Sequence, residues 1–214
     1  MAATVEACEE MLSHLAPAFE PRRLGSPEEI EVGVAWTELA DPLVRARVDE
    51  IAARFPRRRT VGLPLVDPAT YALFMREAAD IHRELFAENA DLYGEDVRIK
   101  IERCLTVSDA DVDRAARLRE EYREQVESAL EGVDLILTPT LPCVAPRLGA
   151  GGVGDLNVRE ALIRFTYPFS TLGWPALAVP CGAAEDGLPA SVQLSGRPGA
   201  DALVLAAGRA LYLV

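Results

Sequence analysis

The spacing of apolar residues divides the chain into helix-forming and strand-forming stretches. Thr4 precedes apolar residues at helical spacing over residues 5–15, which predicts a short capped helix. Apolar residues alternate over 29–36, which predicts a strand, and an apolar stripe after Asp41-Pro42 predicts a helix that begins there. Residues 60–65 predict a further short strand. A strand, a helix and a strand within about 35 residues predict a parallel, right-handed crossover unit.

Two longer helical patterns follow. Asp67-Pro68 begin a helix that we expect to end near Asn89, and Ser108 with Asp111 caps another that ends before Gly132. In the first helix, the face expected to point inward holds Leu73, Phe74, Ala78, Ile81, Leu85 and Phe86. In the second, the buried face is expected to hold Val112, Ala115, Ala116, Tyr122, Val126, Ala129 and Leu130.

Beyond Gly132 the pattern changes to apolar strands and tight loops. We expect a buried strand at 133–137, a loop rich in proline and glycine at 138–155, and a helix at 157–171 opened by Asn157. The remaining elements are expected to be strands at 176–180 and 190–194 around a turn at 185–187, then a nearly all-apolar helix at 200–213. Strands interleaved with helices are typical of an α/β protein. Because the last helix is nearly all apolar, we expect it to be buried or to cover a face of the sheet.

Charge follows the same division. Residues 1–131 hold 28 acidic and 17 basic residues, whereas residues 132–214 hold six and five, giving −12 over 214 residues. We therefore predict a helix-rich acidic part at 1–131 with one strand-helix-strand unit, and a strand-loop-helix part at 132–214 that forms the sheet core and pocket loops. Together they make one partial domain. The acidic total disfavours nucleic acid as a partner, because phosphate binding needs a basic face.

Apolar runs in the chain are shorter than the roughly 20 residues that cross a bilayer, which predicts no membrane partner. Residues 1–14 are typical of an amphipathic start rather than an export signal, so a cytoplasmic location is expected. The four cysteines are scattered, without a C-x-x-C pair, and the chain has two histidines that could act as further metal ligands. That spacing predicts neither a metal site nor a cysteine nucleophile with a histidine partner. No cofactor is expected.

Three features could carry chemistry, and each also has a structural interpretation. Residues 149–154 match G-x-G-x-x-G, but prolines separate them from the preceding strand, which favours a flexible loop over a phosphate cradle. Seven serines are present, and none lies in G-x-S-x-G. Ser195 lies at a predicted strand end without the motif's preceding glycine, which favours a structural role over that of a nucleophile. Lys100, the lone lysine, is expected at the surface or at a pocket rim.

Three phrases in the second half resemble the C-terminal part of the amidase signature family. They are DLILTPTLP at 134–142, YPFSTLGWPALAVPCG at 167–182 and DGLPASVQLSGRPG at 186–199. Fainter similarity extends to YGEDVR at 93–98 and TVEA at 4–7. The resemblance is strong over residues 132–200 and loose before them. It implies the C-terminal portion of an α/β/α fold, with a mixed sheet of about five strands and helices on its faces.

The resemblance also implies a function. Family members cleave or transfer amide nitrogen with a Ser-Ser-Lys triad in a segment rich in glycine and serine. No stretch of this chain matches that segment, so no catalytic residue is carried over, and Lys100 is not in the matching motif. The implied partners are a small-molecule amide substrate and a missing N-terminal half, while homo-oligomerisation is left open. The candidate pocket residues are Thr138, Trp174, Tyr93 and Arg98. The alternative role for these residues is to fix turns and packing.

The leading hypothesis is therefore a C-terminal, pocket-forming part of an amidase that is inactive alone. The A subunit of a tRNA-dependent amidotransferase is the less favoured family member, because Leu162-Ile163-Arg164 stands where those proteins tend to carry an acid before the Phe-Thr pair. A second hypothesis is a non-catalytic binding or interaction module that keeps the amidase frame. A third is a nucleotide-binding protein that uses the loop at 149–154.

Overall fold

The computed structural model describes residues 1–211 and divides into two compact units. The first unit is Met1–Leu65 together with Glu127–Val214, and the second is Val66–Val126. The spatial division differs from the compositional boundary at 131/132, because the segment that precedes residue 66 folds together with the chain that follows residue 126.

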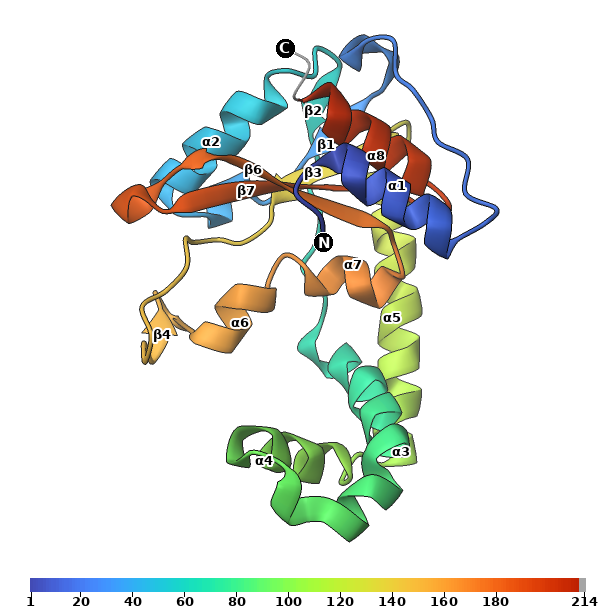
Figure 1. Cartoon of the computed structure of the whole chain (residues 1–214), viewed down its shortest axis with the longest axis vertical. Coiled ribbons are helices and arrows are strands. Elements are labelled where there is room, and N and C mark those ends of the chain that lie inside the picture. The colour runs from blue at the N-terminus through green and yellow to red at the C-terminus, as the bar shows by residue number, and fades with distance from the viewer. Residues whose placement is uncertain (212–214) are drawn as a thin grey trace. The chain divides into compact units, whose positions relative to one another are not determined.

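The first unit is built on a five-stranded mixed sheet of order β2-β1-β3-β7-β6 (Figure 1). β1 pairs in parallel with β2 and β3, whereas β7 pairs antiparallel with β3 and with β6. The α/β class and the mixed sheet expected from the sequence are confirmed. The strands are β1 (Val32–Val34), β2 (Arg58–Thr60), β3 (Leu135–Pro139), β6 (Ala176–Ala183) and β7 (Pro189–Ser195).

The predicted crossover unit is present, but its strands lie at different residues. α2 (Pro42–Ala52) joins β1 to β2, and the pair is parallel. β1 is shorter than the predicted 29–36, because Trp36 adopts a left-handed backbone with φ 61° and ends the strand. The second strand is the exposed Arg58–Thr60 rather than 60–65, since an edge strand needs no apolar sequence. Val61 and Leu63 are buried beyond it.

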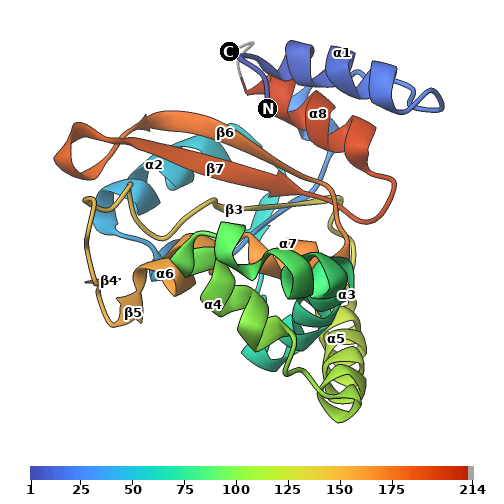
Figure 2. The ribbon, with the colours of Figure 1, turned by 60° about the horizontal axis from the view of Figure 1, so that its bottom comes forward.

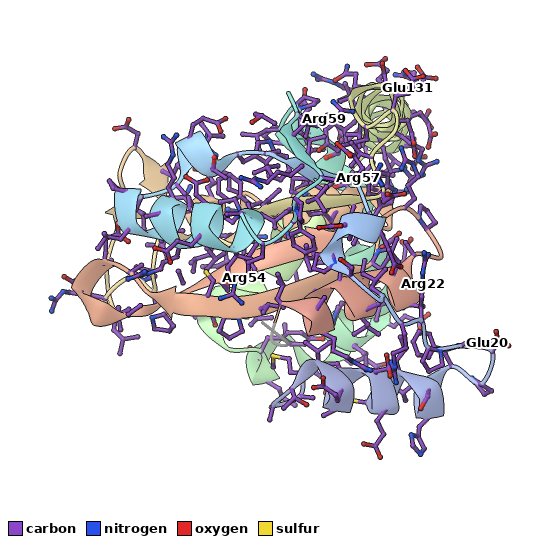
Figure 3. All side chains as sticks on the ribbon, turned by 90° about the horizontal axis from the view of Figure 1, so that it is seen from above. Glu20, Arg22, Arg54, Arg57, Arg59 and Glu131 are labelled. Atoms are coloured by element: carbon purple, nitrogen blue, oxygen red, sulfur yellow. The ribbon has the colours of Figure 1, made fainter. Side chains whose placement is uncertain are left out.

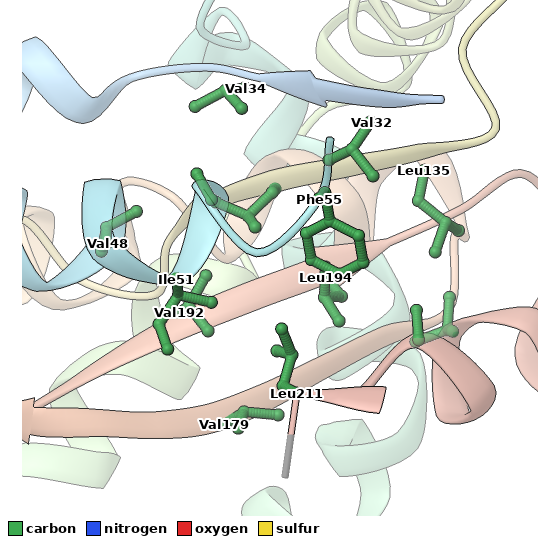
Figure 4. Close-up of a cluster of buried hydrophobic side chains, with 14 of the residues drawn as sticks. Val32, Val34, Val48, Ile51, Phe55, Leu135, Val179, Val192, Leu194 and Leu211 are labelled. Carbon is green, nitrogen blue, oxygen red and sulfur yellow. The ribbon is translucent and has the colours of Figure 1, made fainter. Parts of the chain in front are cut away.

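Alternation along the central strands gives the sheet two different faces. Leu135 and Leu137 of β3 and Val192 and Leu194 of β7 point into one apolar cluster (Figure 4). Phe55, which follows α2, is fully buried in that cluster. Their neighbours in sequence point to the opposite face, because successive side chains of a strand alternate. The opposite face carries Ile136, Thr138, Gln193 and Ser195.

Helices α1 (Val5–Leu15) and α8 (Asp201–Ala210) lie side by side and complete the apolar cluster (Figure 2). The Thr4 hydroxyl accepts a hydrogen bond from the Ala7 N–H at 3.1 Å, so the predicted cap is confirmed. α8 contacts both β6 and β7, as its apolar composition predicted. Residues 212–213 of that predicted helix lie outside the described residues.

The single helix predicted at 157–171 is wrong, because two short helices occupy this stretch. Asn157 caps α6 (Val158–Ile163) by accepting from the Glu160 N–H at 3.0 Å. α7 (Tyr167–Leu172) then begins one residue before Pro168. A proline donates no hydrogen bond and its ring clashes with the carbonyl four residues earlier, so the helix must restart there. Before α6, β4 (Gly152–Val153) and β5 (Leu156–Asn157) form a small hairpin.

The second unit contains α3 (Tyr71–Asn89), α4 (Glu95–Cys104) and most of α5 (Asp109–Ala129). The Ser108–Asp111 cap of α5 is confirmed, with Ser108 Oγ donating to Asp111 Oδ2 at 2.6 Å. The inward face predicted for α3 is wrong. Ala79 is the buried residue of this helix, whereas Phe74, Ile81 and Leu85 are 53%, 72% and 53% exposed.

Hydrogen bonds and ion pairs of charged side chains hold the outer segments of the first unit together. Arg59 of the edge strand β2 donates to the backbone carbonyl of Glu131 at 2.6 Å (Figure 3). On the other side, Glu9 of α1 is 7% exposed and contacts Arg209 of α8 at 2.7 Å and Arg23 at 3.0 Å. Burial opposes ionisation of Glu9, but hydrogen bonds from Arg209 and Arg23 outweigh it and hold the pKa of this carboxyl below its usual value.

We predict that Glu9→Gln lowers the free energy of unfolding by about 3 kcal/mol at neutral pH, because it leaves the largely buried Arg209 without its closest carboxylate. The lowered pKa of Glu9 means that its ionised form stabilises the fold above the ordinary glutamate pKa. This stabilisation is lost as pH falls through the native pKa. Urea unfolding of both proteins across acidic pH measures the difference. A gap that stays constant with pH would contradict the prediction, and Glu10→Gln, at an exposed position of the same helix, is the matched control.

Candidate functional site

The face of the sheet opposite the apolar cluster carries a buried polar contact. Thr138 of β3 and Gln193 of β7 are register partners, 0% and 4% exposed. The Gln193 side-chain amide donates to Thr138 Oγ1 at 3.2 Å and to the Phe165 carbonyl at 3.0 Å. A buried amide is stable there because both donor contacts are made. The contact fixes the connection between α6 and α7 against the end of β3.

Trp174 lies where α7 gives way to β6. Gly173 ends α7 in a left-handed conformation with φ 68°, which glycine adopts without strain. The Trp174 N–H then donates to the Phe169 carbonyl at 3.0 Å, and the indole is 6% exposed. Ser195 Oγ donates to the Pro175 carbonyl at 2.8 Å, so this serine secures the turn. The structural interpretation of Ser195 is confirmed.

An aromatic cluster beside this turn was not found from the sequence. Trp36 stacks on Phe165 with ring centroids 5.5 Å apart and also contacts Phe169 at 5.7 Å. Its indole N–H donates to the Leu63 carbonyl at 2.7 Å. A left-handed backbone at a residue with a side chain costs about 1–2 kcal/mol, and these contacts hold it in place. No local signal marked Trp36, because the rings that it contacts lie far away in the chain.

Two hydroxyls on the same unit have no hydrogen-bond partner among the described residues. They are Thr140 Oγ1, which follows β3, and Thr171 Oγ1 of α7, and both atoms are buried. The Thr140 backbone N–H is satisfied by the Ser191 carbonyl at 2.9 Å. A buried hydroxyl without a partner costs about 1–3 kcal/mol.

Tyr93 and Arg98 belong to the second unit, whereas Thr138 and Trp174 belong to the first. The Tyr93 hydroxyl lies 2.9 Å from His82 Nδ1, and its ring meets Phe86 edge-on with centroids 5.2 Å apart. Arg98 is half-buried in α4. Thr138 and Trp174 lie on neighbouring parts of one unit, and a shared pocket with Tyr93 and Arg98 stays a prediction.

The other sequence candidates have structural surroundings. Lys100 is 51% exposed and pairs with Asp96 at 3.8 Å, so its expected surface position is confirmed. The glycines at 149–154 lead into the β4–β5 hairpin, and the Asn157 side chain occupies the N-terminus of α6. That arrangement favours the loop interpretation over a phosphate cradle. Among residues 1–211 no three His, Cys, Asp or Glu side chains are grouped to hold a metal, and no helix is long and apolar enough to cross a membrane.

The Glu185 carboxylate joins the tip of the β6–β7 hairpin to α2, close to the Asp41 carboxyl group. Glu185 Oε1 accepts from the Leu43 N–H at 2.6 Å, which satisfies the first turn of α2 in place of the Asp41 side chain. Burial and the negative charge of Glu185 raise the pKa of Asp41. Cys143 is buried beside them, and burial and both carboxylates raise the pKa of its thiol.

The match to known proteins covers nearly the whole chain. The model of the family described as Amidase matches residues 9–205. The chain belongs to the amidase family. An amidase of Pseudomonas putida is 32% identical over 177 residues, which are 78% of this chain and 37% of that protein. The A subunit of glutamyl-tRNA(Gln) amidotransferase from Neisseria meningitidis serogroup B is 28% identical over 211 residues, or 95% of this chain and 42% of that protein.

Solved structures agree with this placement. A crystal structure of an amidase superposes with a TM-score of 0.84 at 30% identity, covering 98% of this chain and 51% of that one. The chain therefore spans about half or less of the length of the relatives that it matches. The resemblance recognised from the three phrases is confirmed, as is the family fold.

Replacing Gln193 by Leu should lower the free energy of unfolding by about 1–3 kcal/mol, because the Phe165 carbonyl and the Thr138 hydroxyl both lose a buried partner. Thermal or urea unfolding measures this loss. Gln125→Leu, at a surface position of α5, is the matched control and should stay within about 0.5 kcal/mol of the original chain. Equal stabilities of the two variants would show that the hydrogen bonds of Gln193 contribute nothing to the free energy of unfolding.

Substituting Glu185→Gln should move the pKa of Asp41 down toward its ordinary value of 3.8, because the neighbouring negative charge disappears. A raised aspartate pKa means that the folded state binds the proton more tightly than the unfolded state. Stability therefore falls as pH rises from the ordinary value through the native one, and this fall should shrink in the variant. Titration of the Asp41 carboxyl carbon by NMR tests this, with Glu50→Gln as control. An unchanged Asp41 titration would exclude Glu185 as a cause.

Proposed function

We propose that this chain is the C-terminal, pocket-forming part of an amidase that hydrolyses a carbon-nitrogen amide bond and is inactive by itself. The observation that carries the proposal is the family match over residues 9–205 in a chain that spans about half or less of its relatives' length. The Ser-Ser-Lys segment that the family resemblance implies would come from the part of the relatives that this chain does not span.

The chemistry proposed for the whole enzyme needs no cofactor. A serine hydroxyl attacks the amide carbonyl while a second serine and a lysine take its proton and pass it to the leaving amine nitrogen. Backbone N–H groups stabilise the oxyanion that forms, and water then releases the acyl group as the acid. The substrate is a small-molecule amide, and this chain supplies the walls that position it.

Thr138 and Trp174 are 0% and 6% exposed, so their proposed role is to fix the position of the pocket wall through packing. Side chains fixed by packing and hydrogen bonds hold a substrate more accurately than mobile ones do, which favours catalysis. Thr140 and Thr171 offer unpartnered hydroxyls on the same unit, where the rest of the enzyme or the substrate amide would supply the missing bonds. Tyr93 and Arg98 are proposed as further wall residues from the second unit.

The A subunit of a tRNA-dependent amidotransferase is the second candidate. Its support is the similarity to such a protein over 95% of this chain. The stretch Leu162-Ile163-Arg164 at the end of α6 is the feature that weighs against it, because an apolar residue where those proteins tend to carry an acid would not pair with the amino group of glutamine. Glutamine hydrolysis by the completed enzyme, compared with hydrolysis of simple amides, distinguishes the two candidates.

The isolated chain should release no ammonia above background from acetamide, benzamide or glutamine. A fusion in which this chain replaces the matched region of the Pseudomonas putida amidase should hydrolyse amides, because the fusion contains a complete fold. Trp174→Ala in the fusion should lower kcat/KM by about tenfold or more through a displaced pocket wall. Leu43→Gln, on the exposed side of α2, is the control.

Amide hydrolysis by the isolated chain would contradict the proposal that it is inactive alone. A fusion that is folded by circular dichroism and thermal unfolding, yet binds amides without turnover, would favour the non-catalytic module instead. A fusion that keeps its full activity after the Trp174→Ala substitution would remove Trp174 from the pocket wall while leaving the proposed activity intact.

A further inference from the structure

An apolar stripe on α3 faces solvent. Phe74, Ala78, Ile81 and Leu85 follow one another at spacings of four, three and four residues, so they form one row along the helix. Ile81 is 72% exposed, and Phe74 and Leu85 are each 53% exposed. The opposite side of α3 is the one that packs, where Arg76 pairs with Asp109 at 2.8 Å.

The stripe runs into a shallow, open hollow between the end of α3 and the start of α4. Leu85, Asn89, Leu92, Tyr93, Gly94 and Val97 line this hollow, whose volume is about 430 Å³. Leu92 is 82% exposed at its margin, and the Tyr93 ring is held by His82 and Phe86. We call the stripe and the hollow together the α3 face. A helix that lies along a stripe with one anchoring side chain in a hollow is a recurrent recognition mode.

The charges on α3 that border the stripe have one sign. Glu77, Glu84 and Glu88 are exposed and follow one edge of the stripe at helical spacing. Within the described residues of α3, the cations are Arg76 and Arg83, and both lie on the far side of the helix in contact with aspartates. An apolar row beside a row of carboxylates is complementary to an apolar row beside cations.

We propose that the α3 face is a docking site for an amphipathic helix of another protein, whose apolar side is flanked by Lys or Arg. The charge row decides the occupant. A second copy of this chain would bring its own glutamates against these ones, and an anionic lipid surface would repel them. Burial of the exposed Ile81 and Leu85 side chains stabilises the complex. The glutamates make it specific for a partner helix that carries cations.

The probe is a synthetic helical peptide of about 20 residues, which spans about 30 Å, with leucines in one row and lysines beside them. A twin carries glutamate at every lysine. Fluorescence anisotropy of the labelled peptides with the whole chain should show binding of the lysine peptide alone. Its affinity should fall when ionic strength rises from about 0.1 M to about 1 M, because the Debye length shrinks from about 10 to about 3 Å.

Ile81→Gln with Leu85→Gln should weaken binding of the lysine peptide by at least about tenfold. The two substitutions remove apolar side chains that the bound peptide would bury. Leu15→Gln with Leu43→Gln, both exposed on other helices, is the matched control and should not change it. Glu77→Lys with Glu84→Lys should reverse the preference toward the glutamate peptide. All substituted positions are exposed, so folding is retained.

Four results would overturn the proposal. The first is equal binding of both peptides, and the second is binding that the Ile81 and Leu85 variant leaves unchanged. The third is a dimer in light scattering that the same variant abolishes, which would make the face a self-association surface. The fourth is co-sedimentation with vesicles of phosphatidylcholine and phosphatidylserine that depends on Ile81 and Leu85, which would make it a membrane surface.

Discussion

The antiparallel pairing of β3 with β7 is the constraint on which the first unit depends. This register places Leu137 beside Leu194 and Thr138 beside Gln193, so one face of the sheet is apolar and the other carries the buried polar side chains. A shift by one residue would exchange the two faces, because side chains alternate along a strand. α1, α2 and α8 pack on the apolar face, while the Gln193 amide holds the α6–α7 connection against the polar one. The apolar core and the candidate site are thus products of the same pairing.

Charged groups have a different role in each part of the protein. Glu9 is buried between arginines and joins the N-terminal helix to α8, whereas Glu185 is the hydrogen-bond acceptor for the first turn of α2. Both tie together segments far apart in sequence. The glutamates along α3 remain in solvent beside exposed apolar side chains. Glu9 and Glu185 therefore fix distant segments of the first unit, while exposed carboxylates on the second unit are available to select a partner.

On α3 the sequence periodicity predicted a buried face at residues that the structure leaves exposed. The spacing of Phe74, Ile81 and Leu85 is that of a buried helix face, and the helix does form as predicted. The prediction that these residues point inward was wrong, because a period identifies which residues share a face but not what covers it. Ala79 and the contact of Arg76 with Asp109 lie on the packed side instead.

The sequence by itself determined the family, the α/β class, the helix caps at Thr4, Ser108 and Asn157 and the buried strands near Leu135 and Leu194, because each depends on neighbouring residues or on a distinctive phrase. The tertiary structure decided the left-handed turn at Trp36, the bridge from Gln193 to Phe165 and the Glu9–Arg209 pair, since their partners are far apart in the chain. It also decided which apolar face stayed in solvent. Local patterns encode elements, whereas burial depends on the elements that meet.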